Sequence, residues 1–68
     1  MTPTRERALF ILRCMLLALD CKPNWGPMET LESVTIDHGK RNGVTLEGIE
    51  KIKGMTVAEI LKLPPETA

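Results

Sequence analysis

Apolar side chains fill nearly every position of the first predicted helix. From residue 8 to residue 19 the only charged side chain is Arg13. At 100° per residue, Glu6, Arg13 and Asp20 share one stripe about 40° wide, and apolar side chains take nearly all the rest of the circumference. A helix on the surface of a monomer needs a single apolar face. We therefore expect this helix either at the centre of the domain or against another chain.

Residues with strong positional preferences mark the two ends of this helix. Thr2–Pro3 or Thr4 starts it, because a threonine hydroxyl accepts from a free N–H group and proline is tolerated in the first turn. The helix is predicted to run to about Asp20. Residues 21–27 then hold two prolines and a glycine, which cannot continue a helix, so they form a turn.

Two structures fit the segment after that turn. In one, Pro27 opens a second helix with apolar side chains at three-residue spacing. In the other, residues 33–37 alternate like a strand and pair with 44–46 in a small hairpin around the polar loop 38–43. Helices are favoured over the hairpin, because two isolated strands are only marginally stable.

Threonine caps predict the last two helices. Thr45 is a good N-cap for a helix over 46–53, in which Leu46, Ile49 and Ile52 line one face. Gly54–Met55 ends that helix. The next four residues, Thr56 to Glu59, have the capping-box spacing that begins the last helix.

The chain is predicted to be a single small domain over 1–68. Pro64–Pro65 stops the last helix, and 64–68 is expected to be a frayed tail. The predicted fold class is all-α, with three to four short helices around an apolar N-terminal helix. The alternative is an α+β domain with the 33–37/44–46 hairpin.

Composition and charge limit the classes of partner that the chain is expected to bind. Nine basic and nine acidic side chains cancel, and no run of five or more like charges occurs, so the chain lacks the long-range field that gathers nucleic acid. The 43% apolar and 26% charged content is typical of a folded domain. A chain this short buries only about 60% of its unfolded surface. Contact with a second copy would therefore add much to its stability, which is roughly 3–10 kcal/mol.

The cysteines and the N-terminal segment indicate a cytoplasmic protein. Cys14 and Cys21 share the first helix, where their Cα atoms would be about 10 Å apart, and a disulfide needs less than about 7 Å. The run over 8–19 resembles a secretory signal, but Arg13 interrupts it and no cleavage pattern follows. It is also shorter than the roughly 20 apolar residues that span a membrane. We expect a soluble protein without a membrane segment.

Residues for catalysis are scarce. One histidine, one serine and no tyrosine leave almost no nucleophile–base arrangement. Carboxylate pairs at helical spacing are typical of solvated faces. Cys14, Cys21 and His38 include no CxxC spacing, so no metal site and no cofactor are predicted. We expect that the protein is not an enzyme.

Two patterns keep nucleic-acid binding open as the less favoured alternative. Lys40 and Arg41 lie in a glycine-bounded loop that is able to approach a phosphate. The segment 46–63 is similar to a helix-turn-helix centred on Gly54. The charges of that segment sum to zero, however, whereas DNA readers gain most of their affinity from phosphate contacts.

The sequence therefore favours a small protein–protein interaction module. It is expected to self-associate, to act as an inhibitor or adaptor on a larger protein, or both, as small accessory proteins of phages and mobile elements do. A small helix-turn-helix-like DNA-binding regulator is the alternative. The predicted partner-binding residues are Leu9, Leu12, Leu16, Trp25, Lys40 and Arg41.

Overall fold

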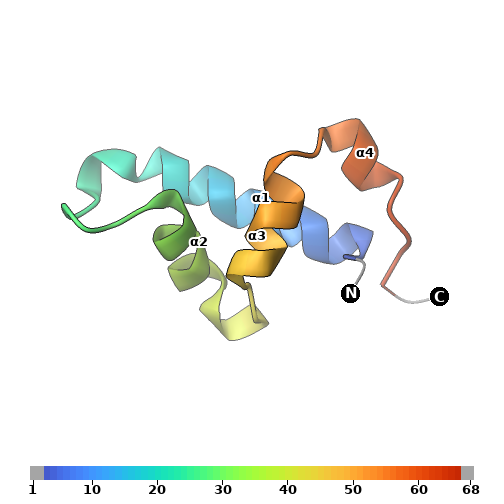
Figure 1. Cartoon of the computed structure of the whole chain (residues 1–68), viewed down its shortest axis with the longest axis horizontal. Helices are drawn as coiled ribbons and strands as arrows, with labels where there is room; N and C mark the ends of the chain where they lie inside the picture. Colours follow the sequence, from blue (N-terminus) through green and yellow to red (C-terminus); the bar gives the residue numbers. More distant parts are fainter. Residues whose placement is uncertain (1–2, 67–68) are drawn as a thin grey trace.

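All regular structure in the described part of the chain is helical. A computed structural model describes residues 3–66 and contains four α-helices and two short 3₁₀-helices (Figure 1). In chain order these are α1 (Arg5–Asp20), η1 (Lys22–Asn24), α2 (Leu31–Gly39), η2 (Lys40–Asn42), α3 (Leu46–Lys53) and α4 (Val57–Leu61). No strand occurs among residues 3–66. The all-α prediction is confirmed, and the alternative with a hairpin is wrong.

Threonine caps start three of the α-helices where the sequence predicts them. The Thr4 hydroxyl accepts from the backbone N–H of Arg7 at 3.3 Å and begins α1. Thr45 begins α3 in the same way, and Thr56 exchanges reciprocal hydrogen bonds with Glu59 at the start of α4. Each cap pairs N–H groups that have no partner inside the helix. The other predicted start of α1, at Thr2, lies outside the described residues.

The second helix begins later than predicted. It starts at Leu31 and not at Pro27, because Thr30 and Ser33 form a capping box in which each side chain accepts from the other's backbone N–H. Proline has no side-chain acceptor to offer at this place. Residues 33–37 lie wholly inside α2, and this is why they cannot form the strand of a hairpin.

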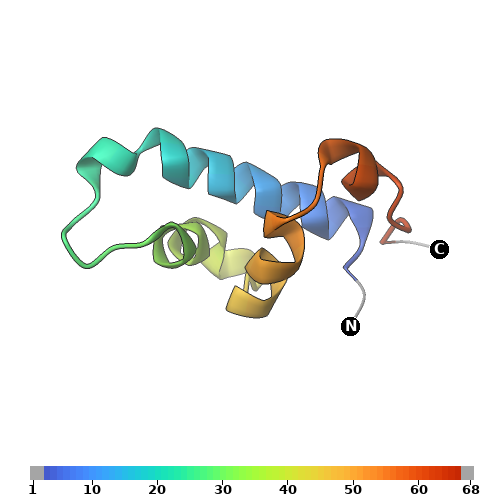
Figure 2. The same cartoon turned by 45° about the horizontal axis from the view of Figure 1, so that its top comes forward.

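The long helix α1 contacts each of the other three α-helices, α2, α3 and α4. Figure 2 shows α2 and α3 on the same side of α1, with α4 near the N-terminal end of α1. The molecule is elongated, 41 × 22 × 15 Å. The sequence left open whether α1 lies at the centre of the domain. The structure places it along one side.

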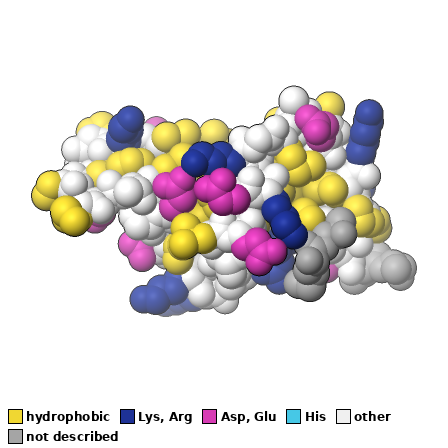
Figure 3. Space-filling view, in the orientation of Figure 1, with side chains coloured by type: hydrophobic (Ala, Val, Ile, Leu, Met, Phe, Trp, Pro, Cys, Tyr) yellow, Lys and Arg dark blue, Asp and Glu magenta, His cyan; other side chains and the backbone are white. Residues whose placement is uncertain are grey.

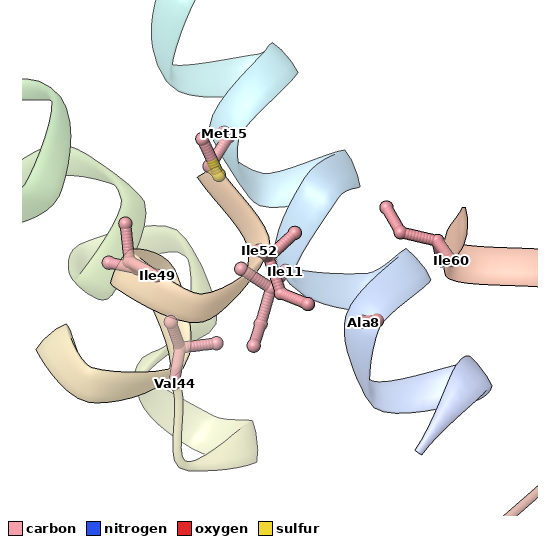
Figure 4. Close-up of a cluster of buried hydrophobic side chains, with 7 residues drawn as sticks. All are labelled: Ala8, Ile11, Met15, Val44, Ile49, Ile52 and Ile60. Atoms are coloured by element: carbon pink, nitrogen blue, oxygen red, sulfur yellow. The ribbon is translucent and has the colours of Figure 1, made fainter. Parts of the chain in front are cut away.

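Isoleucines make up most of the core between α1 and the other helices. Ile11, Ile49, Ile52 and Ile60 are each at most 2% exposed. They pack with Ala8, Met15 and Val44 (Figure 4). The predicted face of α3 is only partly correct, because Leu46 lies at its first residue and is exposed.

Two close contacts in the packing involve glycines of α2 and α3. A Cβ atom added at Gly48 would lie 3.1 Å from Cδ1 of Ile11, so α3 approaches α1 closely at this residue. A Cβ atom added at Gly39 would lie only 2.1 Å from Cγ2 of Val44. The chain after η2 is therefore able to fold back on α2 only because residue 39 has no side chain.

One buried polar atom has no hydrogen-bond partner within the described residues. Thr35 is fully buried in α2, and its Oγ1 is unpaired among residues 3–66. A buried hydroxyl without a partner is destabilising. The described part of the fold therefore contains one unfavourable buried group, on α2.

Part of the predicted frayed tail is joined to the start of α1. The Arg5 N–H donates to the Pro64 carbonyl at 2.8 Å, and the Glu66 N–H donates to Glu6 Oε2 at 2.7 Å. Hydrogen bonds from the Glu6 backbone N–H and from Glu66 lower the pKa of the Glu6 carboxyl. Residues 67 and 68 lie outside the described part of the chain.

Candidate functional site

The two sides of α1 have different environments. The side toward α2, α3 and α4 buries Ala8, Ile11, Cys14, Met15 and Ala18. These positions follow the 3.6-residue period of a helix with one covered face. Of the remaining apolar side chains of α1, Phe10 and Leu12 are half-buried and pack against the core. The exposed ones are Leu9, Leu16, Leu17 and Leu19.

Four leucines follow one another along α1, three of them exposed and Leu12 packed partly against the core, and we call them the leucine face: Leu9, Leu12, Leu16 and Leu19. Leu9 is 36% exposed, Leu16 58% and Leu19 46%, and Leu12 is half-buried. Their spacing of three, four and three residues is that of the a and d positions of a coiled coil. The predicted site included three of these leucines and missed Leu19, although the same spacing would have identified it.

A row of charged side chains borders the leucine face. Glu6, Arg13 and Asp20 are spaced seven residues apart and are all exposed. In the heptad that places Leu9 and Leu16 at a, these three occupy the e positions. The other border, the g positions, consists of Ala8 and Met15, which are buried against the rest of the domain.

The other predicted binding residues lie on elements other than α1. Trp25 follows η1 and is half-buried, and its Nε1 donates to the Ala18 carbonyl near the C-terminal end of α1 at 3.0 Å. Lys40 and Arg41 are exposed on η2, which follows α2 and not α1. The structure therefore places the three predicted leucines on α1, Trp25 against the end of the same helix, and Lys40 and Arg41 on a separate element.

A second exposed apolar group lies between η1 and α2. Met28 is 89% exposed in this connection, and Figure 3 shows apolar side chains at the corresponding tip of the molecule. Because a single exposed methionine at the tip of a loop is common, we do not include it in the candidate site.

Charges on the visible face are mixed in sign. In Figure 3 basic and acidic side chains lie next to one another. Lys53 Nζ is 2.7 Å from Glu32 Oε1, and this hydrogen bond lowers the pKa of the Glu32 carboxyl and raises that of the Lys53 ammonium. A DNA-binding surface needs an excess of unpaired positive charge, and this face does not offer it.

The helix pair α3–α4 is arranged as helix, turn, helix, as the sequence predicts. The connecting turn starts at Gly54, which caps the end of α3, and α4 has only five residues. Five residues extend about 7.5 Å, which is short for a helix that reads a DNA groove. This geometry weakens the DNA-binding alternative further.

A hollow lies between the starts of α1 and α3. Its volume is about 420 Å³, and Arg7, Ile11, Gly48 and Glu66 are among the residues that line it. The Arg7 guanidinium already donates to the Asn42 carbonyl at 2.8 Å. The mixed lining of the hollow indicates no particular ligand.

Possible metal ligands and reactive groups are few. Among residues 3–66, no group of three or more His, Cys, Asp or Glu side chains is placed to hold a metal ion. Cys14 is buried, and burial raises the pKa of its thiol. Cys21 is half-buried, and its Sγ is 3.7 Å from Nε2 of His38. Cys21 and His38 were considered together as possible metal ligands in the sequence analysis, but this contact was not predicted.

A search for membrane-spanning helices and three comparisons with known proteins complete the description. No helix within the described residues has both the length and the apolar character needed to cross a membrane. Comparison of the chain with protein-family models, with curated proteins and with solved structures finds no match.

Proposed function

We propose that this protein is a protein–protein interaction module that self-associates through the leucine face of α1. The observation that carries the proposal is the exposure of Leu9, Leu16 and Leu19, which have coiled-coil spacing, on a helix that also supplies the domain core. Covering such a row of leucines is favourable by about 25 cal/mol per Å² of apolar surface removed from water.

A second copy of the chain is the partner that fits this surface best. In a coiled coil each a or d side chain packs into a hole formed by four residues of the facing helix. A leucine row of this kind is its own complement, so two copies are able to use the same residues in a symmetric dimer. The net charge is zero, and two copies therefore do not repel each other at long range.

The charged row selects the relative direction of the two helices. In an antiparallel pair with all four leucines in register, the e positions face each other, which brings Arg13 next to Arg13 and Glu6 next to Asp20. These contacts join like charges. In a parallel pair the e positions face the apolar g positions, Ala8 and Met15, and no like charges meet. We therefore propose a parallel dimer.

The dimer is tested by light scattering over a dilution series with Leu16→Asp. An aspartate in the middle of the leucine face would be left as an unpaired charge in an apolar interface. We expect the wild-type chain to be dimeric and the variant to dissociate at least about 30 times more readily, the effect of losing one interface hot spot. Because Leu16 is 58% exposed in one copy, helical circular dichroism should be unchanged.

Leu17→Asp is the matched control for this variant. Leu17 is 47% exposed on the same helix but lies outside the leucine face, so the dimer should persist. Two results would contradict the proposal: a wild-type chain that stays monomeric at high concentration, or equal effects of the two aspartates. Salt-sensitive binding of duplex DNA by a monomer would favour the alternative regulator function.

The parallel direction is tested by disulfide trapping with Leu19→Cys in a chain that also carries Cys21→Ser. In a parallel pair the two residues 19 face each other and should cross-link rapidly under mild oxidation. In an antiparallel pair each residue 19 faces residue 9 of the other copy, which puts the two cysteines about 15 Å apart along the helix axis. A disulfide cannot span that distance, so a dimer that resists cross-linking would exclude the parallel arrangement.

A further inference from the structure

Two residues with metal-binding side chains meet where α1 ends. Cys21 is the C-cap residue of α1, and His38 lies in the last turn of α2. Their Sγ and Nε2 atoms are 3.7 Å apart, although 17 residues separate them in sequence. The packing of α1 against α2 therefore places a thiol and an imidazole side by side without any short sequence motif.

The separation of these two atoms matches one edge of a tetrahedral zinc site. Zinc lies about 2.3 Å from a cysteine sulfur and about 2.0–2.1 Å from a histidine nitrogen, which at the tetrahedral angle puts sulfur and nitrogen about 3.6 Å apart. The observed 3.7 Å, which in the metal-free chain is a hydrogen bond between the thiol and the imidazole, is close to this value. The distance between the two atoms is therefore compatible with both acting as ligands of one zinc ion.

The surroundings of the pair allow an ion to enter, and the Cys21 backbone is fixed. Cys21 is half-buried and His38 is exposed, so one side of the pair faces solvent. The backbone N–H of Cys21 donates to the Leu17 carbonyl at 3.1 Å. The Cys21 thiol lies 3.4 Å from the Ala18 carbonyl, a weak hydrogen bond that metal binding would replace.

We propose that Cys21 and His38 form a two-residue binding site for Zn²⁺, with water in the remaining coordination positions. On binding, the thiol releases its proton to solvent, the thiolate and the neutral imidazole each donate an electron pair to the ion, and nothing is oxidised or reduced. A thiolate and an imidazole favour Zn²⁺ over Mg²⁺ or Ca²⁺, which prefer oxygen ligands. The site does not depend on the proposed dimer, because both ligands belong to one chain.

The test is a Co²⁺ titration of the reduced chain without an affinity tag. Binding by Cys21 should produce a thiolate-to-cobalt charge-transfer band in the near ultraviolet, and added Zn²⁺ should remove it. Trp25 is the only tryptophan, and its Nε1 donates to the same Ala18 carbonyl that Cys21 Sγ approaches. Its fluorescence should therefore be quenched by Co²⁺ in parallel with the band.

Three variants make the result decisive. Cys21→Ser should abolish the band, and His38→Gln should weaken Co²⁺ binding at least about tenfold, the smallest loss seen even for an outer partner of a metal ligand. Cys14→Ala is the control and should leave both signals unchanged, because Cys14 is buried. The site is excluded if the wild-type chain gives no band, if Cys21→Ser retains it, or if His38→Gln binds Co²⁺ as tightly as the wild type.

Discussion

Gly39→Ala is expected to lower the free energy of unfolding by about 3 kcal/mol, the upper part of the range for overpacking a core. The added Cβ atom would lie 2.1 Å from Cγ2 and 2.6 Å from Cβ of Val44, and Val44 is itself buried. Either α2 or the start of α3 has to move. Urea unfolding followed by circular dichroism at a single protein concentration measures the change, since a dimer would make stability depend on concentration.

Gly54→Ala is the matched control for that substitution. A Cβ atom at residue 54 has no atom within 4 Å among its described neighbours, and its φ of −97° suits any residue. We expect unchanged or slightly higher stability, because alanine restricts the unfolded chain. Combining Gly39→Ala with Val44→Ala should restore only part of the loss, because the 2.6 Å contact to Cβ remains. Equal stabilities of the two single variants would contradict the close packing at Gly39.

Ile11→Ala is expected to lower the free energy of unfolding by about 2–5 kcal/mol, as for other buried large-to-small substitutions. Ile11 is 2% exposed and lies against α3 at Gly48, so the cavity would open at the crossing of α1 and α3. The total free energy of unfolding is roughly 3–10 kcal/mol. A sizeable fraction of the variant molecules should therefore be unfolded at 37 °C. Thermal unfolding followed by circular dichroism measures this effect.

Leu17→Ala on the same helix should change the melting temperature little, because Leu17 is 47% exposed and alanine favours a helix at least as well as leucine does. A comparable loss of stability in both variants would mean that α1 is not packed by the side that contains Ile11.

The elements predicted correctly are those defined by nearby residues. Thr45 and Thr56 cap helices through hydrogen bonds to residues three positions away, and such contacts can be inferred from spacing alone. The start of α2 was misplaced because Pro27 and Thr30 both resemble helix starts. The reciprocal hydrogen bonds between Thr30 and Ser33 decide between them.

The candidate site was predicted in part. The surplus of apolar side chains on α1 is visible in the sequence, and it identified Leu9, Leu12 and Leu16. Which side of α1 the domain itself covers depends on how α2, α3 and α4 pack, and that packing leaves Leu19 exposed as well. The contact between Cys21 and His38 was not predictable, because it joins two helices across a connection with no regular spacing.

The packing of α1 against three helices that follow it in the chain has a consequence for synthesis of the chain. The residues that cover its inner side come from α2, α3 and α4, and Ile60 follows α1 by 40 residues. At about 5–20 residues per second, several seconds pass before this cover is complete. Until then the helix presents apolar side chains on both sides, and we expect the incomplete chain to bind molecular chaperones.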